Sequence, residues 1–183
     1  ELVGATDFKE PITIDPWTVV ATAMNVRFDK IMDVDFDKYG NVYASGVSWT
    51  TNSFGPDRTS IAKYSPAGAT IWMNDFAPTP NYNGYIYAEL KVLPSGSFLL
   101  GDGAIQTGAG AAIIKVNPAG NVVTTFTLAL GEEEVWKIQY DQCQNEVMFG
   151  GGSYLGQQTY SLIKGLDTNL VGVYNKIDYF GGA

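Results

Sequence analysis

The sequence contains no histidine, and Cys143 is its single cysteine among 183 residues. Without histidine the chain lacks the usual zinc ligand and the usual general base, and it cannot form a Ser-His-Asp or Cys-His catalytic arrangement. A single cysteine excludes an internal disulfide and a cysteine metal cluster. Because these absences remove many enzyme classes, we expect a protein that is not an enzyme.

Charged residues are also scarce, at 16%, and 19 acidic side chains outnumber 11 basic ones. The resulting formal charge of −8 repels phosphate backbones and anionic lipids, so we expect no nucleic-acid partner. No apolar run approaches the roughly twenty residues of a membrane-spanning helix, so we expect no membrane insertion. Sparse lysine with abundant Gly, Thr, Tyr and Asn is typical of an extracellular or cell-surface bacterial protein.

The chain repeats itself. The segment SIAKYSPAGATIW at 60–72 returns as AIIKVNPAGNVVTTF at 112–126, and more weakly as SLIKGLDTNLVGVY at 161–174. Three lysines, Lys63, Lys115 and Lys164, mark this register at spacings of 52 and 49 residues. A second set of anchors, Gly40, Gly96 and Asn145, follows at spacings of 56 and 49. Two independent anchors therefore agree on a period near fifty residues.

Each repeat contains the pattern of four short strands. Apolar and polar residues alternate in a first strand, which is followed by a turn and by a second strand with an apolar run. A Pro-Ala-Gly turn then joins a third strand to a fourth. This pattern predicts an all-β fold of β-propeller-like blades, each made of four antiparallel strands. We expect blades at 27–78, 79–130 and 131–183, with 1–26 forming a partial blade, a closing strand or an arm.

The first repeat resembles the SBBP family of bacterial propeller repeats, whose blades run Asp-x-x-Gly-Asn-Val-Tyr-x-x-Gly, then Ala-Lys-Tyr, then Pro-x-Gly and a tryptophan. The residues that carry the resemblance are Asp37, Gly40, Asn41, Val42, Tyr43, Gly46, Ala62, Lys63, Tyr64, Pro66, Gly68 and Trp72. The second repeat keeps Gly96, Lys115, Pro118 and Gly120, and the third keeps Lys164. The resemblance implies a propeller architecture and assigns no active site.

Three blades are fewer than the four with which closed propellers begin. An array of three exposes two unsatisfied faces, so we expect further blades of a longer chain or other copies of this one as partners. The leading hypothesis is a structural or interaction protein, with a filament as one form of assembly. The alternative is a carbohydrate-binding or adhesion module.

Three alternating carboxylates, Asp33, Asp35 and Asp37, are the candidate metal ligands. They resemble the opening of a calcium loop, although Lys38 and Ala44 occupy the places where that loop has glycine and glutamate. The other interpretation gives them turn and channel-lining roles, because alternate residues of a strand share one face. The repeat aligns Asp33 and Asp35 with Glu89 and Lys91 in the second unit, and with Ile138 and Tyr140 in the third. Apart from possible calcium, no cofactor is expected.

The loop at 49–58, WTTNSFGPDR, is the candidate recognition site. Its aromatic and charged side chains, Trp49, Phe54, Asp57 and Arg58, could stack on a sugar or contact a protein neighbour. The other interpretation is that Trp49 and Phe54 fold back over the edge of the blade.

Overall fold

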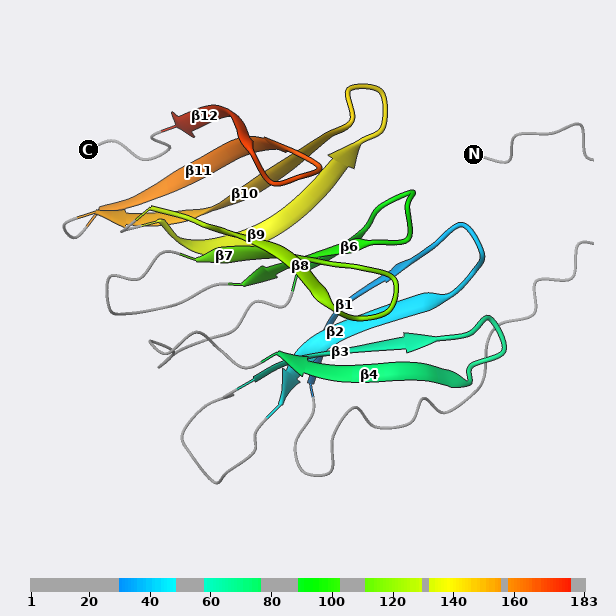
Figure 1. Cartoon of the computed structure of the whole chain (residues 1–183). Helices are drawn as coiled ribbons and strands as arrows, with labels where there is room; N and C mark the ends of the chain where they lie inside the picture. The colour runs from blue at the N-terminus through cyan, green and yellow to red at the C-terminus, as the bar shows by residue number, and fades with distance from the viewer. Residues whose placement is uncertain are drawn as a thin grey trace, which may run out of the picture.

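The computed structural model describes residues 30–48, 58–76, 89–102, 111–129, 132–155 and 158–178, which form twelve strands and no helix (Figure 1). The described residues accordingly provide no helical candidate for a membrane span. The predicted arm at 1–26 lies outside them.

The strands form three separate sheets, each made of four consecutive antiparallel strands. Blade 1 contains β1 (Lys30–Phe36), β2 (Val42–Ser48), β3 (Arg58–Tyr64) and β4 (Thr70–Phe76). Blade 2 contains β5 (Glu89–Val92), β6 (Phe98–Asp102), β7 (Ala112–Val116) and β8 (Val122–Thr127). Blade 3 contains β9 (Glu132–Asp141), β10 (Glu146–Leu155), β11 (Gln158–Asp167) and β12 (Gly172–Asp178). The predicted fold class of propeller-like four-stranded blades is confirmed.

The three blades stack with blade 2 between the other two (Figure 1). Their first strands meet, because β1 contacts β5 and β5 contacts β9. We call β1, β5 and β9 the inner strands. In each blade, the leading face is turned toward the preceding blade and the trailing face toward the following one.

Each blade turns at two residues with positive φ, where a side chain is normally strained. These residues are Gly40 and Gly68 in blade 1, Gly96 and Gly120 in blade 2, and Asn145 and Leu170 in blade 3. The aligned anchors Gly40, Gly96 and Asn145 thus share one backbone conformation. The weak third repeat places side chains where the first two use glycine.

The predicted register of blade 3 is wrong by one residue. Tyr43 pairs with Lys63 and Leu99 pairs with Lys115, but Met148 pairs with Gly165. The cause is that Lys164 lies one residue farther from the β11–β12 turn than Lys63 and Lys115 lie from the corresponding turns, although these three turns have equal lengths. Lys164 instead pairs with Phe149, which packs against blade 2, so Lys164 lies on the opposite face from its supposed equivalents.

The cross-strand pairs define which positions are equivalent in the three blades. On the leading face, Val34 corresponds to Leu90 and Ile138, and Phe36 to Val92 and Tyr140. On the trailing face of the inner strands, Asp33 corresponds to Glu89 and Lys137, and Asp35 corresponds to Lys91 and Gln139. On the trailing face of the second strands, Tyr43 corresponds to Leu99 and Met148. On the trailing face of the third strands, Ile61 corresponds to Ile113 and Ile163. The predicted alignment of Asp33 and Asp35 with Ile138 and Tyr140 is therefore replaced by Lys137 and Gln139.

Two buried clusters hold the stack together. The cluster between blades 1 and 2 contains Tyr43, Ile61, Leu90, Val92, Phe98 and Val116. The cluster between blades 2 and 3 contains Leu93, Leu99, Ala111, Ile113, Leu128, Val135, Ile138, Val147, Phe149, Leu166 and Leu170. Blade 2 is therefore buried on both of its faces.

Candidate functional site

The carboxylates of β1 join the inner strands of blades 1 and 2. Asp33 accepts a hydrogen bond from the Leu90 amide at 2.9 Å, and Asp35 accepts one from the Val92 amide at 2.8 Å. Asp35 also pairs with the Lys91 ammonium at 2.9 Å. These side chains satisfy backbone donors on the edge of β5 that does not pair with β6.

Glu89 repeats this arrangement between blades 2 and 3. Its carboxylate accepts a hydrogen bond from the Ile138 amide at 3.3 Å and pairs with the Lys137 ammonium. Burial raises the pKa of the Glu89 carboxyl, and its hydrogen bond with Lys137 opposes that rise. The same hydrogen bond raises the pKa of Lys137.

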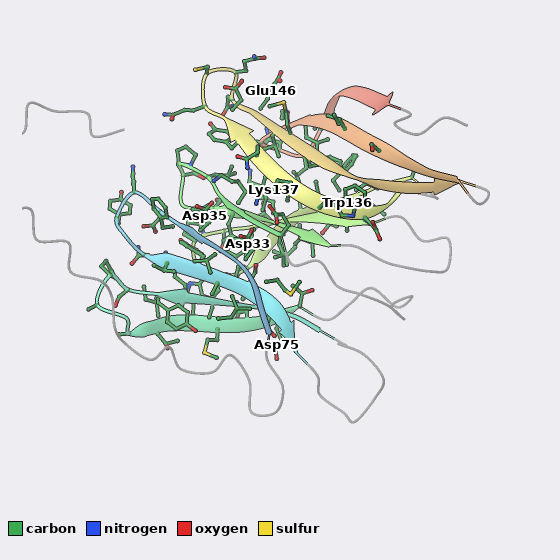
Figure 2. The ribbon with its side chains drawn as sticks, turned by 180° about the vertical axis from the view of Figure 1, so that it is seen from behind. Asp33, Asp35, Asp75, Trp136, Lys137 and Glu146 are labelled. Carbon is green, nitrogen blue, oxygen red and sulfur yellow. The ribbon has the colours of Figure 1, made fainter. Side chains whose placement is uncertain are left out.

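Lys137 also lies 4.0 Å from Asp33, so its charge links all three blades (Figure 2). Together the five charged side chains form one group, which we call the inner charge ladder: Asp33, Asp35, Glu89, Lys91 and Lys137. Opposite charges at equivalent positions on neighbouring inner strands attract one another at close range. The ladder therefore favours one alignment of the neighbouring inner strands along their length.

Asp37 has a different role from Asp33 and Asp35. It accepts hydrogen bonds from the Tyr39 and Asn41 amides at 2.9 and 3.0 Å, and from the Asn41 side chain at 2.8 Å. Its carboxylate lies 3.6 Å from the Lys63 ammonium. Burial alone would raise the pKa of Asp37, but the hydrogen bonds and Lys63 outweigh it and hold the pKa below its usual value. Asp37 is thus a turn residue.

The structure does not gather the three carboxylates of this trio around one point. Asp33 and Asp35 point toward β5, whereas Asp37 points into its own turn, and lysine or backbone donors occupy the oxygens of Asp35 and Asp37. In the part of the chain that the structure describes, no group of three Asp, Glu, Cys or His side chains could hold a metal ion.

The candidate recognition loop remains a prediction. Trp49, Phe54 and Asp57 lie outside the described residues. Arg58 begins β3, where its backbone pairs with Ser48 of β2.

Side chains of one blade donate hydrogen bonds to turn carbonyls of the next. Tyr43 donates to Gly96 at 3.4 Å, Trp72 to Pro118 at 3.1 Å, Asn74 to Gly120 at 2.8 Å and Lys115 to Thr168 at 2.6 Å. Trp72 also stacks on Phe98 with ring centroids 5.9 Å apart. This indole therefore lies in the interface between blades 1 and 2.

The inner strand of blade 1 leaves its leading face open. Val34 is 55% exposed, whereas its equivalents Leu90 and Ile138 are 2% and 0% exposed. Phe36 is 72% exposed, whereas Val92 is 7% exposed. In blade 2, the equivalent amides of Leu90 and Val92 donate to carboxylates of the preceding blade. The amides of Val34 and Phe36 donate instead to the carboxylates of Asp33 and Asp35 within their own strand, at 2.9 Å each. Blade 1 therefore presents an interblade surface with no described blade before it.

The trailing face of blade 3 is open in the same way. Met148 is 37% exposed, whereas its equivalents Tyr43 and Leu99 are both 0% exposed. Ile163 is likewise 37% exposed, and its equivalents Ile61 and Ile113 are buried. Both ends of the stack thus carry the apolar positions that bury against another blade inside the molecule.

Sequence reasoning identified Asp33 and Asp35 but missed Lys91 and Lys137 as their partners, and it missed Glu89 as the carboxylate that repeats their arrangement. The signal was present in part, because the repeat aligned acidic residues of one unit with a lysine of the next. Lys137 escaped notice because the longer turn of blade 3 displaced the alignment by one residue.

No family model matches the sequence, and no curated protein matches it. Solved structures similar to this chain include a protein of unknown function from Bacteroides caccae, at 12% identity and a TM-score of 0.45, covering 81% of this chain and 61% of that one. They also include the Dos1 propeller, at 11% identity and a TM-score of 0.46, covering 80% of this chain and 46% of that one. The chain thus spans roughly half the length of these two structures.

Proposed function

We propose that this chain is a non-enzymatic structural or interaction protein of SBBP-type propeller repeats, which binds other protein chains through the open ends of its stack. The observation that supports the proposal is the exposure of Val34, Phe36, Met148 and Ile163 at positions that are buried in the interfaces between blades.

The apolar character of these residues gives the end faces a binding capacity. Complete burial of one Val, Phe, Met or Ile side chain contributes about 1.5–3 kcal/mol relative to full exposure. Contiguous apolar patches are rare on the surface of soluble monomers, and where they occur they often mark sites of interaction with other molecules.

The charge and composition support an extracellular or cell-surface location. A formal charge of −8 disfavours nucleic acid and anionic lipid as partners, and exposed apolar faces favour a protein partner. A role in adhesion or in a repeating surface assembly is consistent with this location.

Affinity purification from the source cells tests the proposal. A tagged wild-type chain is compared with a Phe36→Asp/Met148→Asp variant, and Val123→Asp is the matched control because Val123 is 56% exposed on β8, away from both end faces. We expect the double variant to lose the proteins that co-purify with the wild type and with the control. An identical set of proteins from all three chains would contradict the proposal.

A further inference from the structure

The two open ends are complementary in polarity and charge. We propose that the partner is a second copy of this chain, docked head to tail, with β9 and β10 of one copy against β1 of the next. This inference rests on the proposed function and names the partner of the same surfaces.

On the leading side, the open surface is one strand wide. Ile31, Val34 and Phe36 of β1 are at least half exposed, whereas Ala44 of β2, and Ala62 and Tyr64 of β3, are buried. The available surface therefore fits the inner hairpin of another blade rather than a complete sheet. In blade 3 that hairpin is β9–β10, whose trailing face is open.

The apolar contact follows the pattern of the interfaces inside the molecule. Tyr43 of blade 1 lies in one buried cluster with Leu90 and Val92 of blade 2. Met148 occupies the position of Tyr43, and Val34 and Phe36 occupy the positions of Leu90 and Val92. A head-to-tail contact therefore places Met148 of one copy over Val34 and Phe36 of the next.

The charges continue the inner charge ladder. Inside the molecule, Lys137 pairs with the carboxylate at the equivalent position of the preceding blade, and its side chain remains 57% exposed. In the docked pair, the equivalent position of the following blade is Asp33 of the second copy. Lys137 therefore meets an acidic side chain on both sides, which favours this orientation over one that juxtaposes like charges.

The backbone donors of β1 also find an acceptor. Gln139 occupies the position of Asp35, whose carboxylate accepts the Val92 amide inside the molecule. The side-chain carbonyl of Gln139 in one copy can accept the Phe36 amide of the next, in place of the bond from that amide to its own Asp35. Head-to-tail contacts of this kind use two different surfaces, so they continue into a ring or an open chain of copies.

Site-specific crosslinking tests the proposal. In a Cys143→Ser background, which removes the exposed native thiol, Phe36→Cys and Met148→Cys chains are mixed and treated with a short bismaleimide. A mixture of Val123→Cys and Met148→Cys chains is the control. We expect the Phe36–Met148 mixture to yield several-fold more covalent dimer than the control mixture. Equal yields from the two mixtures would overturn the head-to-tail contact.

Two differently tagged wild-type copies, expressed together in the source cells, separate this inference from the proposed function. Recovery of one copy with the other, lost in the Met148→Asp variant, supports the inference. Recovery of a different protein without the second copy, also lost in Met148→Asp, overturns the inference and leaves the proposed function standing. If neither the second copy nor another protein depends on Met148, both proposals fail.

Discussion

Blade 2 and the two outer blades use the same positions in opposite environments. Leu99 on the trailing face of blade 2 is completely buried, whereas Met148 at the same position of blade 3 is 37% exposed. Leu90 on the leading face of blade 2 is buried, whereas Val34 of blade 1 is 55% exposed. The comparison shows that the exposure of a strand position depends on whether another blade packs against it, and that the outer blades retain apolar residues on faces with no described blade beside them.

The largest expected difference between blades concerns this trailing position. Leu99→Ala removes a buried side chain between blades 2 and 3, and we expect a loss of about 2–5 kcal/mol in the free energy of unfolding. Met148→Ala in the dilute single chain is expected to cost less than about 1 kcal/mol, because its side chain is partly exposed. Urea denaturation of both variants at low concentration measures the difference. Similar losses for both variants would contradict the open trailing face of blade 3, because they would show that Met148 is as well buried as Leu99.

A smaller difference is expected at the inner strands. Asp35→Ala leaves the Val92 amide and Lys91 without their carboxylate, and a buried donor without its partner costs about 1–3 kcal/mol. Gln139→Ala, at the same position of blade 3, is expected to change stability by no more than about 0.5 kcal/mol. Asp35→Asn is the conservative control, since it retains an oxygen for the Val92 amide. Equal effects of Asp35→Ala and Gln139→Ala would show that the inner charge ladder does not stabilise the blades.

The turns give a comparison across all three blades. Gly40→Ala and Gly96→Ala each place a side chain at a φ near +80°, and we expect a cost of about 1–2 kcal/mol for each. Asn145→Gly relieves the same conformation in blade 3 but removes a hydrogen bond from Tyr140, so its net effect is expected to be a few tenths of a kcal/mol, as an order of magnitude. Thermal unfolding of the three variants provides the measurement. Equal tolerance of Ala at position 40 and Gly at position 145 would argue against a shared turn geometry.

The smallest effect is expected from pH, because burial and hydrogen bonding act on Asp37 in opposite directions. The net pKa of Asp37 is lowered in the folded chain, so its contribution to stability is complete above the ordinary aspartate pKa of about 3.9 and is lost as pH falls through the folded-state pKa. Asp37→Asn is therefore expected to lose less stability than the wild type between about pH 5 and pH 2. Denaturation curves across that range test the sign. A steeper loss for Asp37→Asn would contradict it.

The repeat predicted the architecture because strand alternation and turn residues are local properties. Gly40 and Gly96 mark turns in the sequence for the same reason that they form turns in the structure, namely a positive φ. The register of blade 3 was not predictable in the same way. One additional residue in the β9–β10 turn displaced Lys137 from its apparent equivalents, and Lys164 lies one residue farther from its own turn than Lys63 and Lys115 lie from theirs. A displacement of one residue reverses the face of a strand.

The partners of the carboxylates were beyond local reasoning. Asp33 bonds an amide 57 positions away, and which oxygen meets which donor depends on how two sheets stack. The three alternating aspartates suggested calcium because the pattern shows only their spacing, whereas the lysines and amides that they contact come from other blades. The exposure of Phe36 and Met148 likewise depends on whether another blade lies beside their own, and the sequence of a single strand does not show this.

The central claim is that the open ends of the stack bind each other, and sedimentation velocity of the pure chain over a wide concentration range tests it most directly. We predict that the average mass of the wild-type chain rises with concentration, while Met148→Asp sediments as a single chain throughout. A wild-type chain that sediments as one copy at every concentration, indistinguishable from Met148→Asp, would contradict the account.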